Sequence, residues 1–217
     1  YEMCGRDWSS DVCSSDLMNK VLEILERKPN PNLQLNIFSN FNAPRKYWYD
    51  YNNQIKDYCK SGNLGRFDLT CSIDCWGPQA EYVRNGLDLN KYVSNFEYML
   101  KETKIVLSVN SAMMALSIPT MPDLVKQINS WSKQYRNVYW SMMKAGDVWR
   151  PYLNPTIFGD KVLKLGINEA IDLFDTQNDP IKIGYLNNLK GIAKECEKTE
   201  PNIFNQKQLK EIGRAHV

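Results

Sequence analysis

The chain has 217 residues, of which 43% are hydrophobic and 24% are charged, and its formal net charge is +2. This mildly basic balance, without a long basic run, gives no ground for nucleic-acid binding. The most apolar stretch, 105–118, is interrupted by Ser108 and Asn110 and is too short to cross a membrane.

Both ends of the chain read as sequence that is not natural protein. Asp7–Leu17 and Glu211–Val217 back-translate without strain into sequencing-library adapter, and their shared stretches are reverse complements of each other. Unrelated protein termini have no reason to be related in this way. We therefore expect residues 1–17 and 211–217 to be adapter-derived, and we exclude them from reasoning about the fold.

The remaining segment, 18–210, is then an internal fragment of a longer protein. Excluding the ends removes the single histidine, His216, together with Cys4 and Cys13. The fragment therefore offers no histidine for catalysis or for metal binding. The cysteines that remain are Cys59, Cys71, Cys75 and Cys196. So few cysteines do not form a disulfide framework, which favours a reducing, cytoplasmic location.

Apolar periodicity predicts an alternation of helices and strands along the fragment. In chain order the predicted elements are helix 22–26, strand 33–39, helix 44–61, strand 67–74, helix 88–101, strand 104–110, helix 120–131, strand 137–143, helix 168–174 and helix 183–198. Asp88 is a suitable N-cap for its helix. Thr120 and Asp123 have the spacing of a capping box.

The predicted strands begin about 34 to 37 residues apart, with one helix in each gap. This regular spacing is typical of βαβ units and a parallel sheet, in either a barrel or a doubly wound arrangement. In both arrangements chemistry is expected at the carboxyl ends of the strands. Those ends are 39–42, 72–77, 110–111 and 143–146.

The densest group of reactive and polar residues follows the second predicted strand. Strand periodicity puts Ser72 and Asp74 on one face, with Cys71 and Cys75 on the other. A buried hydroxyl and carboxylate need partners, so this end is either a binding site or an internal polar network. Arg84, after the turn, either reaches back to a carboxylate or phosphate or lies solvated.

The run Phe67–Gly86 resembles the fourth-strand segment of radical S-adenosylmethionine (radical SAM) enzymes, in the branch with SPASM or twitch C-terminal extensions. Leu35–Phe41 lies where that family has its preceding strand, and Lys104–Trp131 resembles the next βα unit. The resemblance covers roughly residues 21–159. It implies an α/β fold, a fragment of a partial (β/α)6 radical SAM barrel with parallel strands alternating with helices. Residues 18–150 would belong to the barrel and residues 151–210 to its C-terminal end or extension helices.

The resemblance also implies an activity and its cofactors. In the family, a [4Fe–4S] cluster binds S-adenosylmethionine (SAM), and one-electron reduction releases a 5′-deoxyadenosyl radical that abstracts a substrate hydrogen. An external electron donor supplies the electron. A laterally open barrel favours a peptide or another macromolecular substrate.

Matched position by position, Ser72 and Arg84 correspond to the SAM-contacting serine and arginine of the family. Asp74 corresponds to the acid of the same motif, and Asn40 is a strand-end candidate for cofactor binding. The chain departs from the family in lacking a Cys-x3-Cys-x2-Cys motif in residues 18–210. The resemblance therefore supplies no metal ligand here. Cys71 and Cys75 are expected in the core.

We therefore expect the parent protein to be an enzyme and this chain to be inactive and poorly stable. Two alternatives stay open. One is a non-catalytic α/β binding scaffold in which Ser72 and Asp74 form only a structural network. The other is a non-radical barrel enzyme that binds an anionic ligand through Arg84.

Overall fold

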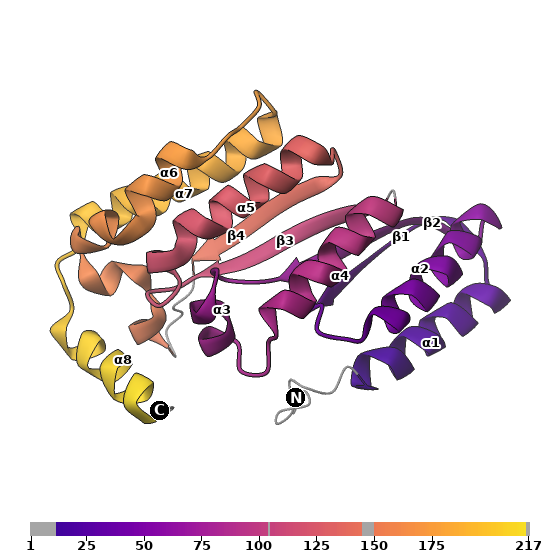
Figure 1. The fold of residues 1–217 in the computed structure, drawn as a ribbon, viewed down its shortest axis with the longest axis horizontal. Coiled ribbons are helices and arrows are strands. Elements are labelled where there is room, and N and C mark those ends of the chain that lie inside the picture. The colour runs from indigo at the N-terminus through magenta and orange to yellow at the C-terminus, as the bar shows by residue number, and fades with distance from the viewer. Residues whose placement is uncertain (1–11, 104, 145–149, 216–217) are drawn as a thin grey trace. The chain divides into compact units, whose positions relative to one another are not determined.

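The computed structural model describes residues 12–103, 105–144 and 150–215 of the chain (Figure 1). His216, residues 1–11 and the strand end at 145–146 lie outside the described residues. The chain divides into two units. Unit 1 comprises Tyr1–Ser72 and Arg84–Ser108, and unit 2 comprises Ile73–Val83 and Val109–Val217.

Helices and strands alternate through most of the described chain. They are α1 (Val12–Arg27), β1 (Asn30–Ser39), α2 (Arg45–Lys60), β2 (Leu64–Ser72), α3 (Pro78–Val83), α4 (Leu89–Glu102), β3 (Val106–Met113), η1 (Ile118–Thr120), α5 (Met121–Gln134), β4 (Val138–Lys144), η2 (Pro151–Leu153), η3 (Pro155–Phe158), η4 (Leu163–Ile167), α6 (Asn168–Leu173), α7 (Pro180–Lys198) and α8 (Ile203–Ala215). The predicted alternation is confirmed. Within the described residues the strands form one four-stranded parallel sheet in the order β1-β2-β3-β4.

The register of β1 on β2 contains an irregularity near its start. Asn30 pairs with Leu64 and Gln34 pairs with Arg66, so residues 31–33 all lie opposite Gly65. A Cβ at Gly65 would lie 2.1 Å from the Pro31 carbonyl oxygen. The bulge therefore depends on glycine at this position, and it explains how proline is tolerated within β1.

In unit 1, α2 and α4 cover one face of the β1–β2 pair (Figure 1). The Tyr51 ring of α2 lies 5.6 Å from the Phe67 ring of β2, measured between centroids. Phe41, fully buried after β1, stacks on Trp48 with centroids 4.2 Å apart. Since Phe67 faces α2, strand alternation turns Arg66 and its alternate neighbours to the opposite face.

In unit 2, α5 packs on β4. The ring of the buried Trp140 in β4 lies 5.4 Å from the ring of Phe174, which follows α6, measured between centroids. A smaller core forms where α8 meets η2 and η3. Its buried members are Ala115, Ile157 and Leu209. Gly166 lets η4 approach η1, because a Cβ there would lie 2.3 Å from the Ile118 carbonyl oxygen.

Two sequence predictions about helix ends have different outcomes. Asp88 is confirmed as the N-cap of α4, where its carboxylate accepts a hydrogen bond from the Lys91 amide at 3.0 Å. The capping box at Thr120 is wrong, because Thr120 makes no side-chain cap bond to α5. Its hydroxyl accepts a hydrogen bond from the Trp76 amide instead, at 3.3 Å.

Over the described residues, no helix combines the length and the apolar character that crossing a membrane requires.

Candidate functional site

The loop after β1 contains Asn40, the first candidate cofactor-binding residue. Asn40 is half-buried, and its side-chain oxygen accepts a hydrogen bond from the Asn42 amide at 3.1 Å. Ser39 accepts likewise from the Phe41 amide at 3.0 Å. Phe41 has a φ of 59°, in the left-handed region that favours glycine. The side chains of Ser39 and Asn40 therefore brace a tight turn, and the Asn40 carbonyl group is already engaged in that turn.

Two asparagines attach this loop to the rest of unit 1. Asn42 donates to the Gly86 carbonyl and accepts from the Asp88 amide at 3.2 Å. The buried Asn95 of α4 donates to the carbonyl oxygens of Phe41 at 2.9 Å and Ala43 at 2.8 Å. The loop after β1 is thus held to the segment that follows Arg84 through side-chain amides.

Ser72 and Arg84, the residues matched to SAM contacts, both belong to unit 1. Ser72 is the last residue of β2 and is half-buried, as is Arg84. The Arg84 carbonyl accepts a hydrogen bond from the Leu87 amide at 2.9 Å, which fixes the turn into α4. Among the described residues, the Ser72 hydroxyl makes no hydrogen bond.

The face of β1 and β2 that points away from α2 carries a polar network that the sequence analysis missed. The Asp68 carboxylate accepts hydrogen bonds from the Gln34 side-chain amide at 2.5 Å and from Arg66 Nε at 2.8 Å. Beside them, the Thr70 hydroxyl donates to Asn36 Oδ1 at 3.0 Å. Polar residues at alternate positions of both strands were the signal that could have found this network.

This face is nearly neutral as a binding surface. The Asp68 side chain is only 11% exposed and is paired with Arg66, whose side chain is 56% exposed. Ser72 continues the same alternation at the carboxyl end of β2, so its hydroxyl lies at the end of the polar face.

Asp74, the remaining candidate, belongs to unit 2. It is buried, and its carboxylate accepts a hydrogen bond from the Ala112 amide of β3 at 2.8 Å. The neighbouring Ile73 carbonyl accepts from the Ser111 hydroxyl at 2.6 Å. Asp74 therefore has a structural partner in the strand beside it. Unit 2 also contains a polar pair at 3.3 Å, in which the Ser141 hydroxyl donates to Asn110 Oδ1.

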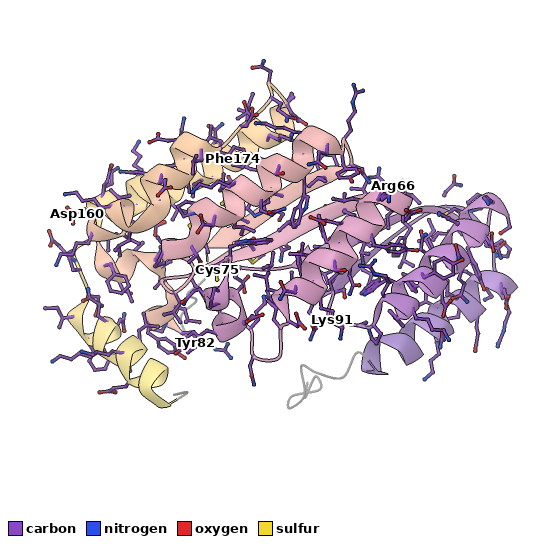
Figure 2. The ribbon with its side chains drawn as sticks, viewed as in Figure 1. Arg66, Cys75, Tyr82, Lys91, Asp160 and Phe174 are labelled. Atoms are coloured by element: carbon purple, nitrogen blue, oxygen red, sulfur yellow. The ribbon has the colours of Figure 1, made fainter. Side chains whose placement is uncertain are left out.

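The cysteines of the motif lie in the apolar core. Cys71 and Cys75 are both 0% exposed, and Figure 2 marks Cys75 just beyond the end of β2. Burial raises the pKa of the Cys71 thiol well above its ordinary value, which disfavours the thiolate that metal ligation requires. Cys196 is also buried, and mainly for that reason its pKa is raised to about 11.

Comparison with known proteins identifies no family and no function for this chain. The chain matches no protein-family model, no curated protein and no solved structure. The candidate site therefore rests on the residues themselves. Unit 1 contains Asn40, Ser72 and Arg84, and unit 2 contains Asp74.

Proposed function

We propose that this chain carries consecutive βα units of a radical SAM enzyme, and that Ser72 is its contact to SAM. The observation that carries the proposal is the half-buried Ser72 hydroxyl at the carboxyl end of a parallel strand, at the end of a polar strand face. Ligands of α/β proteins bind at this end of parallel strands. A hydroxyl without another bond suits hydrogen bonding to the polar groups of SAM.

The other candidates would contribute less directly to SAM binding. One Asp74 oxygen is engaged by the Ala112 amide, and the Asn40 oxygen is engaged by the Asn42 amide. Their role would be to hold the strand ends in place. Arg84 would pair with the SAM carboxylate, as the resemblance implies. The Arg84 guanidinium suits a carboxylate because it offers paired N–H donors.

The described residues do not fit a [4Fe–4S] cluster. No group of three His, Cys, Asp or Glu side chains in this part of the chain could hold a metal ion. Cys71 and Cys75 are both buried in the core, and burial raises the pKa of the Cys71 thiol, which disfavours its thiolate. We therefore assign no reaction step to this chain. The cluster ligands of the proposed enzyme would be encoded outside it, and its substrate would be a peptide or another large molecule.

The proposal is tested by reading the source gene outward from codons 18–210. A Cys-x3-Cys-x2-Cys triplet in a loop after an upstream strand is the expected result. An upstream reading frame that continues without such a triplet would contradict the proposal. If the gene encodes residues 1–17 and 211–217 as they stand, the adapter interpretation is wrong and His216 returns as a candidate.

A second candidate function is a non-catalytic α/β binding scaffold. The hydrogen bond from Ala112 to Asp74 favours it, because this motif carboxylate already serves the structure. The gene also separates the two candidates, since a scaffold needs no cysteine triplet. SAM binding that depends on Ser72 would favour the enzyme.

A further inference from the structure

The core-facing side of α2 is unusually polar. The buried residues of this helix are Trp48, Tyr51, Asn52 and Ile55, which follow one another at helical spacing. Only Ile55 is aliphatic. The indole Nε1 of Trp48, the hydroxyl of Tyr51 and the Oδ1 of Asn52 are buried atoms without a hydrogen-bond partner among the described residues.

These atoms belong to side chains that are almost completely enclosed. Trp48 and Asn52 are each 3% exposed, and Tyr51 is 7% exposed. A buried polar group without a partner costs about 1 to 3 kcal/mol. Three such groups within two helical turns would cost a large part of the stability of a small unit. Native proteins therefore rarely leave groups of this kind unsatisfied.

The three side chains share the buried face of α2, which we call the patch. Trp48 and Asn52 are one helical turn apart, and the Trp48 and Tyr51 rings are 6.3 Å apart between centroids. The patch is walled by aromatic rings, since Trp48 stacks on Phe41 and Tyr51 meets Phe67 edge-on. Burial also raises the pKa of the Tyr51 hydroxyl, so this group is the neutral phenol.

We propose that the interior of unit 1 holds an internal water site at this patch, shared by Trp48, Tyr51 and Asn52. The three groups offer an indole donor, an amide acceptor and a hydroxyl that does both. A water molecule matches this set, because it accepts from Trp48, donates to Asn52 and bonds Tyr51 in either sense. Internal waters make about three hydrogen bonds of this kind. The site is independent of the proposed function.

The first test is the sign of the effect of Tyr51→Phe on unfolding by urea. If the hydroxyl bonds water, its loss raises the unfolding equilibrium constant roughly two- to tenfold. If the hydroxyl is an isolated buried group, its removal lowers that constant, and the proposal is overturned. Tyr49→Phe, on the exposed side of the same helix, is the matched control and stays within roughly twofold of wild type.

The second test detects the water directly by NMR of ¹⁵N-labelled Tyr51→Phe protein. This background removes magnetisation relayed through the Tyr51 hydroxyl. The Trp48 indole proton, assigned by its loss in Trp48→Phe, is expected to show a cross-relaxation peak at the water frequency. The absence of that peak from both this protein and the wild type would overturn the proposal.

Discussion

The side-chain amide of Asn95 donates to two backbone carbonyls, those of Phe41 at 2.9 Å and Ala43 at 2.8 Å. A residue of α4 thereby fixes the conformation of the loop that follows β1. Because Asn95 is 1% exposed, water cannot replace these bonds when the amide is removed.

We predict that Asn95→Leu lowers the free energy of unfolding by about 2 to 3 kcal/mol, since it leaves two buried carbonyls without donors. Urea denaturation followed by circular dichroism measures this change. Asn90→Leu, at an exposed position of the same helix, is the control and should change stability by less than about 0.5 kcal/mol. Equal effects of the two variants would show that the Asn95 bonds are not stabilising.

Gly65→Ala should be among the most damaging small substitutions in unit 1. The added methyl would lie 2.1 Å from the Pro31 carbonyl oxygen and 2.8 Å from its carbon, so the β1 bulge has to move. We expect a loss of more than about 2 kcal/mol in the free energy of unfolding. Gly184→Ala in α7 meets nothing within 4 Å and should instead stabilise the helix by about 0.5 to 1 kcal/mol. A neutral Gly65→Ala would rule out the bulge.

The Ser111 hydroxyl of β3 makes two hydrogen bonds within unit 2. It donates to the Ile73 carbonyl at 2.6 Å and accepts from the Trp140 indole Nε1 at 3.0 Å. We predict that Ser111→Ala costs about 2 kcal/mol, because a buried carbonyl and a buried indole both lose a partner. In a double-mutant cycle with Trp140→Phe, the two losses should be less than additive by about 0.5 kcal/mol or more. Strict additivity would argue against the Ser111–Trp140 bond.

Stability should fall on the alkaline side because of the buried thiols. The pKa of Cys196 is raised to about 11, mainly by burial, while a thiol in the unfolded chain ionises near about 8.5. The folded state therefore retains a proton that the unfolded state has lost, so stability is full below about pH 8.5 and falls as the pH rises to about 11. Cys196→Ala should flatten this fall in urea titrations between those pH values. An unchanged slope would mean that Cys196 titrates normally.

Ser72→Ala tests the proposed SAM contact. Loss of one hydroxyl hydrogen bond should weaken SAM binding to the chain by about five- to tenfold, without a comparable change in stability. Isothermal titration calorimetry with SAM measures the affinity, and Ser130→Ala on the exposed side of α5 is the matched control. Equal affinities of the two variants would remove Ser72 from the binding site, and a wild-type chain that binds no SAM would remove the site from this chain.

The alternation of helices and strands could be read from the sequence because it depends on local periodicity. Leu35 and Ile37 alternate with Asn36, and Asp88 caps its own helix, so both features are visible within a few residues. Thr120 was misread because its hydroxyl bonds Trp76, which is distant in the chain. The β2 strand was predicted to reach Asp74, but it ends at Ser72. The apolar and polar alternation continues past Ser72, so local periodicity does not mark this end.

The candidate site was predicted less completely than the fold. Strand alternation correctly separated Ser72 from the buried Cys71. It could not show that Asp74 receives the Ala112 amide, since that bond joins segments far apart in sequence. The network around Asp68 was missed for a different reason. Arg66 lies on the same strand as Asp68, but the bond to Gln34 of β1 depends on the register of the two strands, which the sequence does not reveal.

The discontinuity of unit 1 has a consequence for how the chain is made. Phe41 and Ala43 are synthesised early, but the side-chain amide that holds them belongs to Asn95. The ribosome makes Asn95 only after it has made Ile73–Val83, which belong to the other unit. The emerging chain cannot complete its first unit before beginning its second. A gene cut after Ser72 should therefore yield a product that is degraded rather than a small folded domain.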